Sequence, residues 1–272
     1  MDHPNDARRC SAMCFDLDSR PPISPIEGGA ADSAEMVLQA ADGNRYTAFS
    51  ARAAKPTGAG MIVLPDVRGL HIYYEDLALR FAEIGVDAVA IDYFGRTAGL
   101  GRRGPDFDNS EHIPQTTIDG LTADITAAAQ YLRSPEGGSV EKLFTVGFCF
   151  GGRLSFLTPT MALGLAGSIG FYGWPVGPHR SGMPAPAEAA AQMKNPILAM
   201  FGGADQGIPT SAAHDFERAL ENAGVEHRVV IYPGAPHSFF DRKADEFAKT
   251  SAEAWAEVRR FIEAHSSGAA TA

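Results

Sequence analysis

Residues 141–156 read EKLFTVGFCFGGRLSF and carry the strongest structural signal in the chain. The first half of this stretch is rich in residues that favour β-strands, whereas the residues after Gly152 are compatible with a helix. Between the two halves, Cys149 stands in a G-x-C-x-G turn with Gly147 and Gly151. This pattern is typical of a nucleophile elbow in which cysteine takes the place of serine.

The glycines of this turn have a steric reason, because larger side chains would collide where a strand turns sharply into a helix. The turn would present Cys149 at the N-terminus of that helix, where the helix dipole and free N–H groups favour a thiolate. An isolated free cysteine is equally often a small buried hydrophobe. The motif alone therefore leaves both interpretations open.

Strands and helices alternate on both sides of the turn, and the dipeptide Asp42-Gly43 predicts a hairpin between the first two strands. Such alternation predicts an α/β fold with a mostly parallel central sheet and helices on both faces. The predicted strands are 34–40, 45–53, 59–65, 86–92, 142–148, 165–173, 195–203 and 226–233, and the predicted helices are 73–85, 117–133, 210–224 and 244–266.

The 272 residues, of which 45% are hydrophobic and 21% charged, are typical of one soluble globular domain. We expect a single α/β domain over residues 34–265, an N-terminal arm over 1–33 and a C-terminal tail over 266–272. The glycine-rich segment 95–117 is long for a simple connection and is a candidate lid. No apolar run approaches the roughly 18 residues of a membrane span, and the N-terminus lacks the apolar segment of a secretory signal.

The net charge of −10 argues against nucleic acid and acidic membranes as partners, so an anionic substrate would need a local arginine. The three cysteines, Cys10, Cys14 and Cys149, are an odd number and too few for a disulfide framework. Cys10 and Cys14 are spaced too widely for a C-x-x-C pair, and no Cys/His cluster suggests zinc. These features predict a cytoplasmic enzyme with free thiols, and we expect it to be a monomer or homodimer.

Two further residues favour the catalytic interpretation of Cys149. Asp205 follows the predicted strand 195–203, and His237 follows the strand 226–233. A lone aspartate in a turn is usually a cap, and a lone histidine usually has no catalytic role. Here, however, nucleophile, acid and histidine occur in the chain order of a triad, each at the carboxyl end of a strand, where ligands bind in such sheets.

With these residues the chain resembles the dienelactone hydrolase family of the α/β-hydrolase fold over roughly residues 45–265. The resemblance rests on GFCFGGR, FGGADQGIP and PHSFFDR, together with VLPDVRGL and AIDYFGRTAG. It implies that the chain hydrolyses an ester or lactone, such as an enol lactone, by a Cys-His-Asp triad without a cofactor. In this mechanism His237 takes the thiol proton, Asp205 orients the imidazole, and Cys149 forms a thioester that water hydrolyses.

The backbone N–H groups of Val67 and Phe150 are the candidates for the oxyanion hole. Where family members often carry a glutamate near the thiol, this chain has Asp66. Where well-known members carry a substrate-binding arginine after the histidine, it has Asp241, with Arg242 next to it.

Arg96 matches another family arginine, so we expect it to bind a carboxylate of the substrate; the alternative is that it pairs with Asp92 or another loop acid. Arg68 is an additional candidate, although an arginine in an exposed loop is more often only solvated.

Two other functions remain compatible with the sequence. A general carboxylesterase or thioesterase would use the same triad on an uncharged substrate. A thiol sensor would use Cys149 without turnover, but it would need neither Asp205 nor His237.

Overall fold

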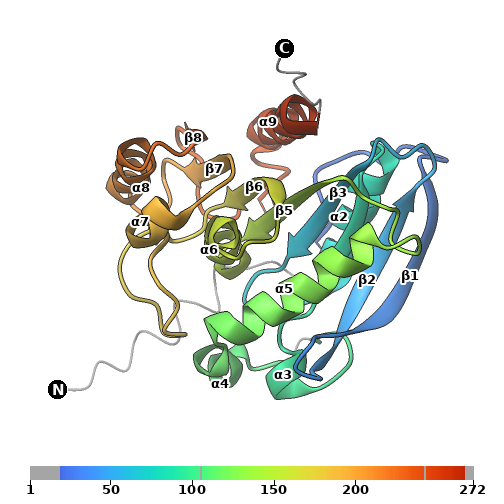
Figure 1. Cartoon of the computed structure of the whole chain (residues 1–272). Coiled ribbons are helices and arrows are strands. Elements are labelled where there is room, and N and C mark those ends of the chain that lie inside the picture. The colour runs from blue at the N-terminus through green and yellow to red at the C-terminus, as the bar shows by residue number, and fades with distance from the viewer. Residues whose placement is uncertain (1–18, 105, 242, 267–272) are drawn as a thin grey trace, which may run out of the picture.

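The computed structural model describes residues 19–104, 106–241 and 243–266, and this part of the chain contains an eight-stranded sheet. In spatial order the strands run β1-β2-β4-β3-β5-β6-β7-β8 (Figure 1). The pairs β1/β2 and β2/β4 are antiparallel, and every later pair is parallel. The strands are β1 (Ala30–Gln39), β2 (Arg45–Ala53), β3 (Ala59–Leu64), β4 (Asp87–Ile91), β5 (Lys142–Phe148), β6 (Leu165–Phe171), β7 (Ile197–Gly202) and β8 (His227–Tyr232).

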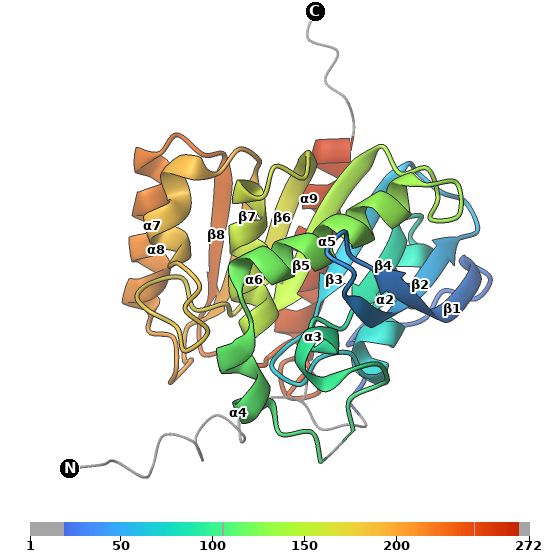
Figure 2. The same cartoon turned by 60° about the horizontal axis from the view of Figure 1, so that its bottom comes forward.

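Helices cover both faces of this sheet. Figure 2 shows α5 and α6 crossing one face, with α9 behind the other. The rings of Phe81 in α2 and Trp255 in α9 lie 5.2 Å apart, which places α2 on the same face as α9. The helices are α2 (Ile72–Glu83), α3 (Gly95–Ala98), α4 (Asn109–His112), α5 (Ile118–Arg133), α6 (Phe150–Leu157), α7 (Pro186–Ala189), α8 (Thr210–Asn222) and α9 (Ala248–Ser266), with short 3₁₀ helices at Ile113–Gln115, Thr158–Thr160 and Ala190–Gln192.

The predicted α/β-hydrolase architecture, a mostly parallel sheet with helices on both faces, is confirmed, as is the hairpin around Asp42-Gly43. Most ends of the elements lie within two residues of the prediction, and three differences are larger. Strand β1 begins at Ala30, inside the expected arm of residues 1–33, because it extends along β2 to Ala53. The segment 95–117 contains α3, α4 and a 3₁₀ helix, and α9 begins at Ala248 instead of residue 244.

The centre of the sheet forms the hydrophobic core. Every residue of β3, β4 and β7 is buried, as expected for strands covered by helices on both faces. Because β3 to β8 pair in parallel, the loops that follow β3, β5, β7 and β8 leave the sheet at one edge. That edge carries the candidate site. Among the described residues, none of the helices combines the length and apolarity needed to cross a membrane.

Candidate active site

The turn between β5 and α6 has the geometry of an elbow. Cys149 adopts φ 54° and ψ −111°, in the left-handed half of φ space that non-glycine residues rarely occupy, and α6 begins at the next residue. A Cβ on Gly147 would collide with the carbonyl oxygen of Gly151, and one on Gly151 would collide with those of Leu64 and Pro65. The steric reason predicted for these glycines is therefore confirmed.

Asp205 and His237 are brought together by the loops that follow β7 and β8. The Nδ1 atom of His237 lies 2.6 Å from Oδ2 of Asp205, and the other carboxylate oxygen accepts the N–H groups of Gly207 and Ile208 at 2.8 and 3.0 Å. The Asp205 side chain is only 1% exposed. Asp205 therefore both caps its own loop and holds the imidazole by Nδ1, which leaves Nε2 for another partner.

The imidazole also interacts with the thiol of Cys149. Burial alone would lower the pKa of His237, but the hydrogen bond to Asp205 and the interaction with Cys149 outweigh burial and raise the pKa to about 10. The site thus favours a protonated imidazole beside the sulfur. The ring of Tyr172 packs 4.7 Å from the imidazole and limits its movement.

A cavity of about 170 Å³ opens at these side chains. This volume is well below the roughly 300 to 1,000 Å³ typical of sites for drug-sized ligands, so the cavity suits a small acyl group or ring. Its walls are mainly aromatic and apolar, with two arginines and two histidines among them. The lining residues are Val67, Cys149, Phe150, Arg153, Tyr172, Trp174, His179, Arg180, Gly207, Ile208 and His237.

The predicted oxyanion-hole residues, Val67 and Phe150, both line this cavity. Phe150 is the first residue of α6, where backbone N–H groups have no acceptor within the helix. Two tyrosines hold the loop that carries Val67. The hydroxyl of Tyr93 donates to the carbonyl of Pro65 at 2.6 Å and to the carbonyl of Asp66. The hydroxyl of Tyr74 accepts the N–H of Asp66. The loop therefore approaches the sulfur in a fixed conformation.

Asp66, the residue between Pro65 and Val67, is buried next to the thiol. Its Oδ1 atom accepts the N–H of Arg68 at 2.8 Å. Burial raises the pKa of Asp66 to about 8, and the negative charge of Cys149 adds to this shift. Asp241 is also buried and accepts the hydroxyl of Tyr172 at 2.9 Å, whereas Arg242 lies outside the described residues, as do Cys10 and Cys14.

Arg96 does not line the cavity and is held elsewhere. Its guanidinium makes two hydrogen bonds of 2.9 Å to the fully buried carboxylate of Asp124 and a third, of 2.6 Å, to Asp42. This matches the alternative in which Arg96 braces the chain through a loop acid, although the expected partner Asp92 instead pairs with Arg103. Arg68 is half-buried and is also not among the lining residues.

The loop of residues 173–185, which leads from β6 to α7, supplies Trp174, His179 and Arg180 to the cavity, and none of these three was predicted from the sequence. The buried Arg153, directly after the elbow, fixes this loop by donating to the carbonyls of Trp174, Gly177, Met183 and Pro184 at 2.9 to 3.2 Å. The sequence signal is limited to the position of this loop after a strand at the carboxyl edge, which does not specify which of its residues enter the cavity.

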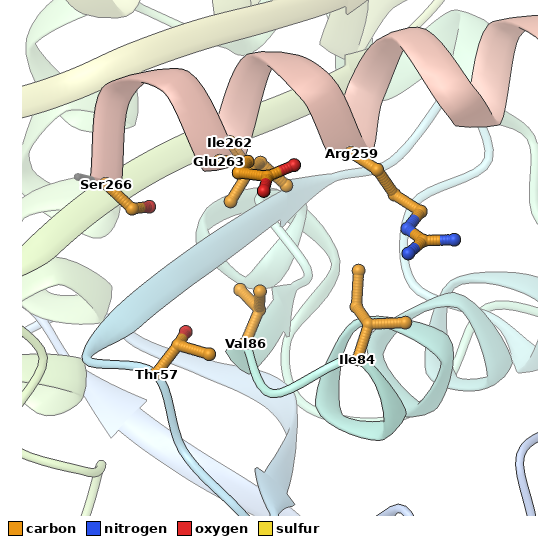
Figure 3. Close-up of a pocket in the computed structure, with 7 residues that line it drawn as sticks. All are labelled: Thr57, Ile84, Val86, Arg259, Ile262, Glu263 and Ser266. Atoms are coloured by element: carbon orange, nitrogen blue, oxygen red, sulfur yellow. The ribbon is translucent and has the colours of Figure 1, made fainter.

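A larger hollow, of about 510 Å³, lies between α9 and the loops that precede β3 and β4. Figure 3 shows Ile262 and Glu263 on the helix above Val86 and Thr57, and Arg259 above Ile84. It is therefore at the amino ends of these strands and shares no residue with the triad. Its lining contains no cysteine or histidine, so the reactive groups concentrate in the smaller cavity.

The smaller cavity thus unites a thiol, an imidazole, an orienting carboxylate and two backbone positions suited to an oxyanion. These are the groups required for acyl transfer to sulfur. Within the described ranges, no group of three or more His, Cys, Asp or Glu side chains is placed to hold a metal ion.

Known proteins were compared with this chain. A model of the dienelactone hydrolase family matches residues 47–266. A protein of Escherichia coli (strain K12) described as a carboxymethylenebutenolidase is 28% identical over 226 residues, covering 78% of this chain and 80% of its own. A protein of Bradyrhizobium sp. described as a 2-oxo-3-(5-oxofuran-2-ylidene)propanoate lactonase is 28% identical over 232 residues, covering 80% and 90%.

Among solved structures, a dienelactone hydrolase of Klebsiella pneumoniae subsp. pneumoniae MGH 78578 superposes with a TM-score of 0.75. It is 24% identical, and the match covers 87% of this chain and 98% of the other. At this identity the likeness supports the fold.

Proposed function

The chain belongs to the dienelactone hydrolase family and is a hydrolase of esters or lactones, and we propose that it opens a small enol lactone with a Cys149-His237-Asp205 triad through a thioester intermediate. One observation carries this proposal: Cys149 and His237, whose ring is hydrogen-bonded to the buried Asp205, line one small cavity. A thiol sensor would not need that pair.

In the first half-reaction, the sulfur of Cys149 attacks the lactone carbonyl while the N–H groups of Val67 and Phe150 stabilise the oxyanion. The C–O bond of the ring then breaks, and the imidazolium of His237 gives its proton to the departing enol oxygen. The raised pKa of His237 supports this order, because it keeps the ring protonated beside a thiolate.

In the second half-reaction, the now neutral His237 takes a proton from water, which attacks the thioester carbonyl. The C–S bond breaks, the carboxylic acid leaves, and the thiolate–imidazolium pair is restored. Asp205 remains hydrogen-bonded to Nδ1 throughout and keeps Nε2 directed at the reacting atoms.

The substrate class follows from the cavity and from a relative. A volume of about 170 Å³ with aromatic walls fits a five-membered ring. The Bradyrhizobium relative is named for an oxofuran-ylidene substrate that carries a carboxylate, and we extend that substrate class to this chain. Action in the cytoplasm and a monomeric or homodimeric state stay predictions from the sequence.

The test is a hydrolysis screen that compares cis- and trans-dienelactone with neutral p-nitrophenyl esters, with Cys149→Ala as the blank. We expect turnover of the lactones and, on rapid acid quenching, a mass increase on the peptide that contains Cys149. Turnover of neutral esters alone would support a general esterase, and alkylation of Cys149 without turnover of any compound would support a sensor.

A further inference from the structure

The loop of residues 173–185 places two adjacent polar side chains, His179 and Arg180, in the wall of the cavity that contains Cys149. Both residues carry side-chain N–H donors that could face a polar group of the substrate. Arg153, the other lining arginine, already donates to four loop carbonyls. Arg96 is occupied by Asp124 and Asp42 outside the cavity.

The hydrogen bonds of His179 determine its tautomer. The backbone N–H of Ser181 donates to Nδ1 at 3.2 Å, and the Oγ atom of Ser181 lies 2.7 Å from the same nitrogen. That oxygen in turn accepts the N–H of Met183. Because Nδ1 accepts, the proton of the neutral ring resides on Nε2, which makes Nε2–H a hydrogen-bond donor.

The ring is also kept neutral. Burial, together with the positive charges of Arg153 and Arg180, lowers the pKa of His179 to about 4. His179 packs 5.4 Å from the ring of Phe150, whose backbone N–H is a candidate for the oxyanion hole. This neutral donor therefore lies in the cavity wall beside Phe150.

Arg180 supplies the positive charge of this wall. Its side chain is exposed, and one guanidinium nitrogen lies 3.5 Å from Oδ1 of Asn109 at the start of α4. Among the ion pairs of the described residues, none within 4.0 Å involves Arg180. The nearby Asp108 has its pKa lowered mainly by hydrogen bonds from Ser110, with a smaller contribution from Arg180. The guanidinium thus retains donors for a ligand.

From these contacts we propose that Arg180 and His179 form the subsite for the substrate's carboxylate, so that this loop determines selectivity for anionic lactones. The inference rests on the proposed function and assigns to this loop the role that the sequence suggested for Arg96. Arg180 provides a charge-assisted hydrogen bond to one carboxylate oxygen, and Nε2–H of His179 provides a neutral one. Arg153 acts as a positioning residue that fixes the loop.

The test compares dienelactone with its methyl ester, in which the carboxylate is methylated and neutral, by following ring opening. Loss of a charge-assisted hydrogen bond corresponds to roughly a tenfold to hundredfold change in binding. Arg180→Ala should raise KM for the acid by that factor, leave kcat within about twofold and change KM for the methyl ester by less than twofold. Arg180→Lys should recover part of the loss.

Two further variants make the comparison specific. His179→Leu should raise KM for the acid about two- to tenfold, and His179→Gln, which keeps an N–H donor, should restore most of it. Arg218→Ala removes the same charge from the exposed surface of α8 and is the matched control, with no expected change for either lactone. Equal effects of Arg180→Ala on both lactones, or no effect, would overturn the assignment.

Binding without turnover separates this proposal from the proposed reaction. In a Cys149→Ala background, calorimetry should show that the acid binds more tightly than the methyl ester and that Arg180→Ala removes this preference. If wild type opens neither lactone but this preference is present, the reaction is wrong and the subsite stands. If the Cys149→Ala protein has no preference for the acid, the subsite is refuted, whatever the turnover.

Discussion

The loops after β7 and β8 and the segment after β4 leave the same edge of the sheet, but they direct their polar residues differently. Asp205 and His237 meet at 2.6 Å, and His237 lines the cavity. Arg96, in α3 after β4, turns away and pairs with the buried Asp124. The two regions differ in how firmly the backbone and the length of the side chain fix the position of the polar atoms.

The two triad loops are connected to each other by backbone hydrogen bonds. Gly203 donates to Tyr232 at 2.8 Å, and Ala204 donates to Ala235 at 2.9 Å. With short side chains and fixed backbones, the position in the chain determines where the polar atoms lie. Arginine has a long flexible side chain, so its position in the chain does not determine its partner.

The first prediction tests the region around Cys149, Asp205 and His237. Alkylation of Cys149 by iodoacetamide should abolish hydrolysis in proportion to modification, and Cys149→Ala should lower kcat/KM by about 10⁴-fold or more, because no other group can form the acyl intermediate. The measurement is residual activity against mass-spectrometric occupancy of the thiol. A protein with Cys10 and Cys14 changed to serine is the control and should keep wild-type activity. Full activity of Cys149→Ala would remove cysteine from the mechanism.

The second prediction separates the two partners of the thiol. His237→Ala removes proton transfer and should cost about 10²- to 10⁴-fold in kcat/KM, at least as much as any change at Asp205. Asp205→Asn is the sharper variant, because an amide oxygen can still accept from Gly207 and Ile208 while the imidazole loses its orienting anion. Circular dichroism should show both variants folded. Wild-type kcat/KM in Asp205→Asn would point to another carboxylate as the third member.

The sequence predicts those parts of the molecule that depend on local signals, and it does not predict those that depend on tertiary packing. The strand–turn–helix at Cys149 and the alternation of strands and helices were sufficient for the fold, because steric demands on glycine and continuous apolar strands are local signals. The chain order of Cys149, Asp205 and His237 was sufficient to place them at one edge. That these three act as a triad stays a prediction until the variants are measured.

Other parts of the site could not be predicted. The buried Asp124 lies on α5, so its pairing with Arg96 depends on how α5 packs on the sheet, which no local pattern specifies. The loop of residues 173–185 has no regular periodicity, and its course depends on the hydrogen bonds from Arg153 to its carbonyls. Its contribution to the cavity therefore emerges only from tertiary structure.

The third prediction tests the region after β4. Arg96→Ala leaves the buried carboxylate of Asp124 without its main partner and should lower the free energy of unfolding by about 3 to 5 kcal/mol in urea titrations. The double variant Arg96→Ala/Asp124→Asn should recover part of this loss, since no charge is then buried unpaired. Hydrolysis of charged and neutral substrates should fall alike. A rise in KM confined to the charged substrate would mean that Arg96 binds the substrate's carboxylate and would contradict its assignment to a structural role.

The last prediction concerns Asp66, which lies in the loop after β3 and is buried next to Cys149. Burial and the charge of Cys149 raise its pKa to about 8 from the ordinary aspartate value of 3.8. Between these two values the folded protein holds a proton that the unfolded chain has released. The contribution of Asp66 to stability is therefore fully present below about pH 4 and is lost as the pH rises toward 8.

Asp66→Asn keeps the size and an oxygen for the N–H of Arg68 but cannot ionise. One proton linkage is worth at most about 1.4 kcal/mol per pH unit, and relaxation around a buried group reduces it, so the variant should gain about 1 to 2 kcal/mol on wild type between pH 5 and 8. Urea titrations at pH 5, 6, 7 and 8 measure this difference. A difference that stays constant with pH would mean that Asp66 titrates normally. In that case the carboxylate is charged beside the thiol at neutral pH, and its repulsion would oppose formation of the thiolate on which the proposed mechanism depends.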